Sequence, residues 1–96
     1  MDPTLQELAR ERRATLSTLS DEAIMSLPPM LSETISAQQN VQVTQYHDVL
    51  AAGEHLVVVQ ASRERWFGLF TSIAVDGFAL VPDGSRRELT EQEKWT

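Results

Sequence analysis

The amino-acid sequence predicts an α+β domain in which N-terminal helices pack on a four- to five-stranded antiparallel β-meander. Apolar residues recur at helical spacing near the N-terminus, apolar runs of strand length follow one another over 41–81, and turn-forming residues separate these runs. The 96 residues have the size of one domain. We divide it into a helical section (1–39), an antiparallel sheet (41–89) and a C-terminal turn (90–96).

The first helix is expected to begin at Asp2 and Pro3 and to end near Leu19. An aspartate side chain can accept hydrogen bonds from exposed backbone amides, and proline suits the first position of a helix. The apolar residues that follow lie three or four positions apart, so they form one stripe along the helix. They are Leu5, Leu8, Ala9, Leu16 and Leu19.

Ser20 is expected to cap a second, short helix over 21–27. Pro28 and Pro29 should end it, because neither residue can donate a hydrogen bond to a continuing helix. A further helical turn or two is predicted over 30–39, where Leu31 and Ile35 lie four residues apart and share one face.

The sheet is expected to begin with a strand over 41–47, in which Val41 and Val43 face one way and Tyr46 the other. The second strand (55–61) and the third (65–75) carry apolar residues on both faces, which is typical of strands buried on both sides. A turn over 51–54 and a loop over 62–64 connect these strands.

Asp76 and Gly77 are predicted to form a two-residue hairpin turn, since both residues tolerate positive φ. A fourth strand over 78–81 then leads to a turn over 82–85, and a short charged edge strand follows over 86–89. Thr90 and Glu93 have the spacing of a capping box, which predicts a final helical turn.

Composition excludes several function classes. A formal charge of -6 disfavours nonspecific binding to nucleic acid or to an anionic membrane surface, and the absence of cysteine excludes disulfides and thiolate zinc sites. Neither a signal peptide nor an apolar run approaching about 18 residues is recognisable, so we expect a cytoplasmic protein. Seven of the eight basic residues are arginine, a bias typical of GC-rich bacterial or phage genes.

The two histidines are the main candidates for catalysis. A hairpin could bring His47 close to His55, and two imidazoles with a carboxylate could bind a metal or transfer protons. Neighbouring strand residues point to opposite faces, however, and the sequence contains no metal-binding spacing, phosphate loop or nucleophile motif. We therefore expect a structural role for both histidines, no metal, no cofactor and no enzymatic activity.

Two pairs of arginines flank predicted turns. In a meander the loops after the second and fourth strands open at the same end of the sheet, so these arginines are predicted to converge there. Guanidinium groups suit carboxylate and phosphate, which would favour an acidic protein partner or a small anion. The alternative is that they are solvated turn residues paired with Glu64 and Glu88. The four residues are Arg63, Arg65, Arg86 and Arg87.

Trp66 and Phe70 lie in the third strand and complete the candidate binding residues. The helices can cover only one face of the sheet, so the linker, Trp95 or a second chain must cover the other. A two-fold homodimer is the commonest symmetric solution. We expect a small interaction or regulatory module that binds a protein partner. The alternatives are a small-molecule-binding domain with its pocket between helices and sheet, and an enzyme using His47 and His55.

Overall fold

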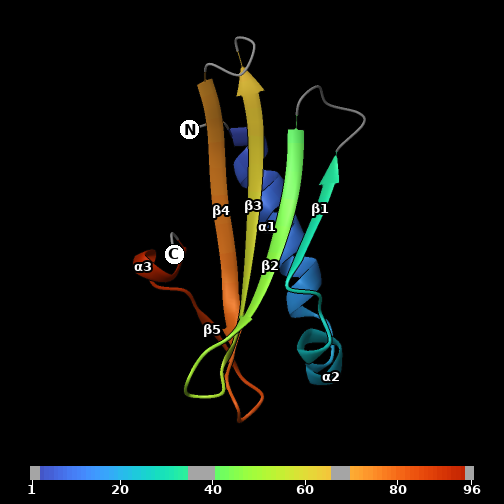
Figure 1. The fold of residues 1–96 in the computed structure, drawn as a ribbon, viewed down its shortest axis with the longest axis vertical. Coiled ribbons are helices and arrows are strands. Elements are labelled where there is room, and N and C mark those ends of the chain that lie inside the picture. Colours follow the sequence, from blue (N-terminus) through green and yellow to red (C-terminus); the bar gives the residue numbers. More distant parts are fainter. Residues whose placement is uncertain (1–2, 35–40, 66–69, 95–96) are drawn as a thin grey trace.

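Five strands form one antiparallel sheet in the order of the sequence, with helices before and after it (Figure 1). The computed structural model describes residues 3–34, 41–65 and 70–94. The predicted α+β class and meander are therefore confirmed. The elements are α1 (Pro3–Ser17), α2 (Asp21–Met25), β1 (Met30–Thr34), β2 (Val41–Val49), β3 (His55–Arg65), β4 (Phe70–Leu80), β5 (Arg86–Glu88) and α3 (Glu91–Lys94).

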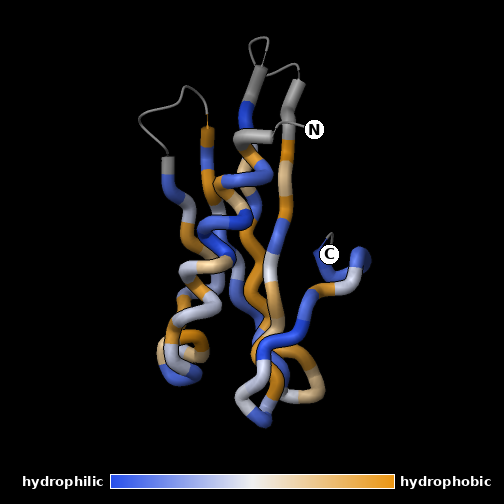
Figure 2. The backbone as a smooth tube through the Cα atoms, turned by 180° about the vertical axis from the view of Figure 1, so that it is seen from behind, coloured by the Kyte–Doolittle hydropathy of each residue, from blue (hydrophilic) through white to orange (hydrophobic). Residues whose placement is uncertain are grey.

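The core lies between α1 and one face of the sheet (Figure 2). Leu5 and Ala9 of α1 are fully buried against a sheet surface that includes Val57, Val59 and Phe78, all of which are also fully buried. Each large side chain removed from water in this way contributes about 1.5–3 kcal/mol. The apolar stripe predicted for the first helix is thus the surface that holds the helix on the sheet.

The corner between α1 and α2 forms as expected. The Ser20 hydroxyl accepts a hydrogen bond from the Ala23 amide at 3.2 Å, and Ile24 is fully buried under the corner. Arg86 of β5 donates to the Leu19 carbonyl and to the Asp21 carboxylate, both at 2.8 Å. The last strand therefore anchors the end of the helical section.

The helical prediction for 30–39 is wrong where it can be checked, because Met30–Thr34 form the edge strand β1. The Pro29 carbonyl accepts the His47 amide at 3.0 Å, next to the first pair of the β1–β2 ladder. The Ser32 and Thr44 hydroxyls then meet across the strands at 2.9 Å. The hydrogen bonds to β2 therefore determine the structure of this segment, and the four-residue spacing of Leu31 and Ile35 does not. Residues 35–39 lie outside the described residues.

The predicted Asp76–Gly77 turn is also wrong, since both residues lie inside the continuous strand β4 and pair with Val59 and Val58. The glycine serves close packing instead. A Cβ atom on Gly77 would collide with the Val57 carbonyl oxygen and would lie 2.6 Å from Leu89 Cδ1. β3 likewise continues to Arg65 through the stretch 62–64 that was expected to be a loop.

The remaining predictions near the C-terminus hold. The turn over 82–85 has Gly84 at φ +93° and a Val81 amide that donates to the Ser85 carbonyl at 2.9 Å. The capping box is present, because the Thr90 amide donates to Glu93 Oε1 at 3.0 Å and the Glu93 amide donates to Thr90 Oγ1 at 3.2 Å.

We predict that Gly77→Ala lowers the free energy of unfolding by about 1–3 kcal/mol, because the new methyl group overpacks a site closed by backbone. Urea unfolding followed by circular dichroism measures this. Gly77→Asn should be worse than Gly77→Ala, since asparagine is larger. Asparagine is favoured in a hairpin turn, so an Asn variant as stable as the unmodified protein would contradict the strand assignment.

Candidate binding surface on the uncovered face of the sheet

The face of the sheet opposite α1 is covered only at one end. Strand register places side chains of opposite strands on the same face, so Tyr46, Val58 and Gly77 lie in one row across β2, β3 and β4. Near the β2–β3 and β4–β5 turns, a small apolar cluster shields this face. The cluster contains Leu50, Leu56, Val58, Ala79 and Leu89.

Beyond that cluster apolar side chains remain accessible. Tyr46 is 38% exposed, Met30 60% and Ile73 36%, and Val58 and Val75 are half-buried. The prediction that β3 and β4 are buried on both sides therefore holds for the α1 face and not for the middle of the opposite face. α3 covers part of the gap without closing it.

A groove of about 620 Å³ lies on this open face, between β2 and α3. The groove has an apolar floor and charged rims. Leu56, Val58, Gln60 and Val75 line its floor, Tyr46 and Asp48 its β2 side, and Glu93 and Lys94 its α3 side, with Pro29 and His47 at one end. Sequence reasoning missed this groove, although the capping box and the doubly apolar strands each indicated one of its walls.

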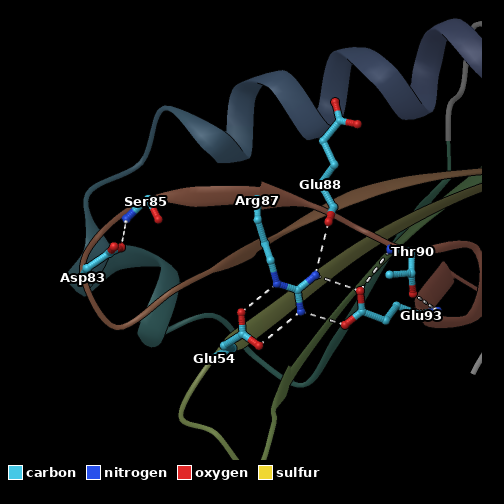
Figure 3. Close-up of polar contacts among 7 residues, drawn as sticks. All are labelled: Glu54, Asp83, Ser85, Arg87, Glu88, Thr90 and Glu93. Carbon is cyan, nitrogen blue, oxygen red and sulfur yellow. Dashed lines mark hydrogen bonds and ion pairs between the residues drawn. The ribbon is translucent and has the colours of Figure 1, made fainter.

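Arg87 holds α3 in place beside the groove (Figure 3). Its guanidinium donates to both oxygens of Glu54 at 2.7 and 3.2 Å, and to both oxygens of Glu93 at 2.8 Å. Such two-pronged contacts are the strongest that arginine makes with carboxylates. Arg87 therefore links the β2–β3 turn, β5 and α3, and it is already saturated by the chain's own acids.

The arginine network shifts the pKa of each partner. Hydrogen bonds from Arg87 lower the pKa of Glu93 to about 2, and they lower the pKa of Glu54. The same bonds, to Glu93 first and Glu54 second, raise the pKa of Arg87. A carboxylate whose pKa falls on folding contributes stability above its unfolded pKa, and that contribution is lost as the pH falls through the folded pKa.

We therefore predict that Glu93→Gln lowers the melting temperature, and that the difference from the unmodified protein depends on pH. It should stay constant above the ordinary glutamate value of 4.5 and should be largely lost by about pH 2. Thermal unfolding at pH 7, 4.5 and 2 measures it. Glu91→Gln, on the exposed side of α3, is the matched control. An equal difference at pH 7 and pH 2 would contradict the charge-based account.

The predicted convergence of four arginines is wrong. Arg63 pairs with Ser72 and Arg87 with Ala79, so the two pairs lie about 23 Å apart along β4 at 3.3 Å per residue. Because Asp76–Gly77 is not a turn, residues 62–64 and the β4–β5 turn lie near opposite ends of β4. Arg65 and Phe70 are register partners at the far end, and their side chains, like Trp66, are outside what the structure describes.

The two histidines meet as the sequence suggested. His47 Nε2 and His55 Nδ1 are 2.9 Å apart, and the rings stack with centroids separated by 5.1 Å. His47 Nδ1 lies 2.9 Å from the Leu27 carbonyl oxygen. Since a carbonyl can only accept, Nδ1 of His47 carries the proton, and neutral His47 then accepts from Nδ1–H of His55 at its Nε2 atom.

The pair thus connects the segment that follows α2 to β2 and β3. Among the described residues no third His, Cys, Asp or Glu joins the two rings in a group that could hold a metal ion. Three of the four ring nitrogens therefore take part in hydrogen bonds.

We predict that both histidines are Nδ1–H tautomers at pH 8, a state that long-range proton–nitrogen correlation spectra read directly. In His55→Gln, His47 should keep its Nδ1 proton because the Leu27 carbonyl still accepts it. A protonated Nε2 and bare Nδ1 on neutral His47 would contradict the assigned direction of the hydrogen bonds.

Comparison with other proteins adds no family to this geometry. Neither a protein-family model nor a curated protein nor a solved structure matches the chain. Within the described residues, no helix has both the length and the apolar character needed to cross a membrane. Function must therefore be argued from the surface itself.

Proposed function

We propose that this chain is a non-enzymatic interaction module that associates with a second copy of itself through the open face of the sheet. The observation that carries this proposal is the groove with a largely apolar floor, Asp48 on one rim and Lys94 on the other. We further propose a cytoplasmic location, where a chain without cysteine folds without disulfides.

The apolar floor supplies the driving force. Tyr46, Val58 and Ile73 leave apolar surface in contact with water on the side of the sheet opposite α1. Burying such surface contributes about 25 cal/mol for each Å² removed from water. Two sheets that pack face to face lie about 10 Å apart, a distance at which side chains on the two faces interdigitate.

Charge complementarity favours a second copy as the occupant. Asp48 lies on the β2 side of the groove and Lys94 on the α3 side. A two-fold axis parallel to the strands exchanges the two sides, so each Lys94 would face the Asp48 of the other copy. Each contact would then occur twice, as in any interface between identical surfaces.

We predict that Asp48→Lys and Lys94→Glu each raise the dissociation constant of the dimer by about tenfold or more, because each creates two like-charge contacts. The double variant Asp48→Lys with Lys94→Glu should restore dimerisation. Sedimentation equilibrium across a concentration series measures all three constants.

Glu7→Lys, on the exposed side of α1, changes the net charge as Asp48→Lys does and should leave the dimer intact. Val58→Lys, in the middle of the floor, should give a monomer. A monomeric unmodified protein at high micromolar concentration, or a double variant as weak as the single ones, would overturn the proposed dimer.

The groove volume also supports a second candidate, a small-molecule-binding domain, because ligand pockets commonly measure about 300–1,000 Å³. This pocket lies between the sheet and α3, not under α1, where the core is filled. A fragment screen by proton–nitrogen correlation spectra would test it. Ligands whose shifts map to Val58 and Val75 in the monomeric Asp48→Lys variant would favour this candidate over the dimer.

A further inference from the structure

The outer edge of β4 is mostly without a neighbouring strand. β4 has eleven residues, and β5 pairs only with Phe78, Ala79 and Leu80. Among the described residues no strand pairs with this edge from Phe70 to Gly77, and Figure 1 shows β5 leaving β4 near one end. Unpaired backbone amides and carbonyls along a strand edge are a template for another strand.

The direction of the backbone groups follows from the last turn. The Val81 amide donates to Ser85 across the β4–β5 turn, so alternate residues back along β4 aim their N–H and C=O outward. At Gly77 the chain caps both groups itself, because the amide donates to Asp76 Oδ1 at 2.8 Å and the carbonyl accepts from Arg13 Nε at 3.3 Å. The outward groups that remain are those of Thr71, Ile73 and Val75.

The edge lacks the features that usually prevent strand addition. Residues 70–75 contain no charge and no proline, and their unbroken pairing with β3 contains no bulge. The other two edges differ, since β5 carries Arg86, Arg87 and Glu88, and β1 follows two prolines and contains Glu33. β4 is thus the edge suited to pairing with a partner strand.

A cationic pocket lies where this edge ends. A cavity of about 240 Å³ is lined by Arg10, Arg13 and Lys94, with Asp76 and Glu88 as the acidic residues and Gly77 and Leu89 completing it. Arg12, Arg86 and Arg87 form ion pairs with carboxylates. Within the described residues Arg10 and Arg13 form none. Lys94 pairs with Glu91 at 3.6 Å, so the two arginines are the cations that this pocket keeps for an incoming anion.

The position of β5 decides which end of a partner strand reaches this pocket. β5 occupies the edge from Phe78 onward, so an added strand must end beside Gly77. A strand parallel to β4 would present its C-terminal carboxylate there, among the cations. An antiparallel strand ending there would present its ammonium group, which the cations would repel.

We infer that the free edge of β4 binds the extended C-terminal segment of a partner protein, whose terminal carboxylate is held by Arg10 and Arg13. The added strand would pair with Thr71, Ile73 and Val75. This site lies at the strand edge and not on the open face proposed for dimerisation, although Lys94 borders both. It defines the partner by chemistry: an uncharged, β-forming C-terminal segment with a free carboxylate.

The test uses two libraries of random hexapeptides attached through their N-termini, one with free C-terminal carboxylates and one amidated. The unmodified protein should retain a subset of the free-acid peptides and bind their amidated forms at least tenfold more weakly. Retention of no peptide, or equal binding of both forms, would overturn the inference.

Variants assign the binding to the edge and the pocket. Ile73→Pro removes one outward amide without removing a bond to β3 and should abolish binding, whereas Ile73→Thr keeps the amide and should bind. Arg10→Gln with Arg13→Gln should remove the preference for free acids, and the paired lysine variant should keep it. Full binding by Ile73→Pro would contradict strand addition.

The monomeric Asp48→Lys variant separates this inference from the proposed dimer. It leaves β4, Arg10 and Arg13 unchanged, so it should retain the same free-acid peptides. A variant that loses peptide binding together with dimerisation would place the peptides on the open face and overturn the edge site.

Discussion

A single amphipathic helix must cover a five-stranded sheet, and the rest of the molecule depends on that limit. α1 has fifteen residues and spans about 22 Å at 1.5 Å per residue, whereas β3 and β4 have eleven residues each and reach about 36 Å at 3.3 Å per residue. One such helix can therefore cover at most one face of the sheet. It does so with fully buried Leu5 and Ala9, and no second long helix among the described residues covers the opposite face.

The opposite face is closed only where other constraints bring the chain across it. Leu89 packs on Gly77, which is possible because position 77 has no side chain, and Arg87 then fixes α3 through Glu93. These contacts cover the end of the sheet near the turns and stop there. The groove is therefore the part of this face that lies between β2 and the short helix α3 and that neither element covers.

The sequence predicted local structure well where one residue type determines it. Ser20, the two prolines, the turn at Gly84 and the capping box at Thr90 each gave the correct element, because caps and turns depend on neighbours in the chain. Gly77 was misread because its role depends on Leu89 and Val57, which sequence spacing does not place beside it. Because of that single error, the predicted direction of every later strand was reversed. Arg63 and Arg87 were therefore predicted at the same end of the sheet.

The candidate sites were harder to predict for the same reason. The meeting of His47 and His55 needs only one hairpin and was foreseen, whereas the groove needs α3 to lie beside β4 and the cationic pocket needs α1 to lie beside β4. Arg10 and Arg13 belong to the first helix. They reach the strand edge because the apolar residues Leu5 and Ala9 of the same helix pack on the sheet. Long-range packing, not local pattern, positions these side chains.

Lys94 connects the two proposed surfaces, since it lines both the groove and the cationic pocket. A carboxylate bound beside Arg10 and Arg13 would attract the same ammonium group that is proposed to face Asp48 of a second copy. The two events would then compete for one charge, and each would weaken the other by the same factor, because coupling between two binding equilibria is reciprocal. Glu91 lies 3.6 Å from Lys94 and is a third carboxylate that can pair with this ammonium group.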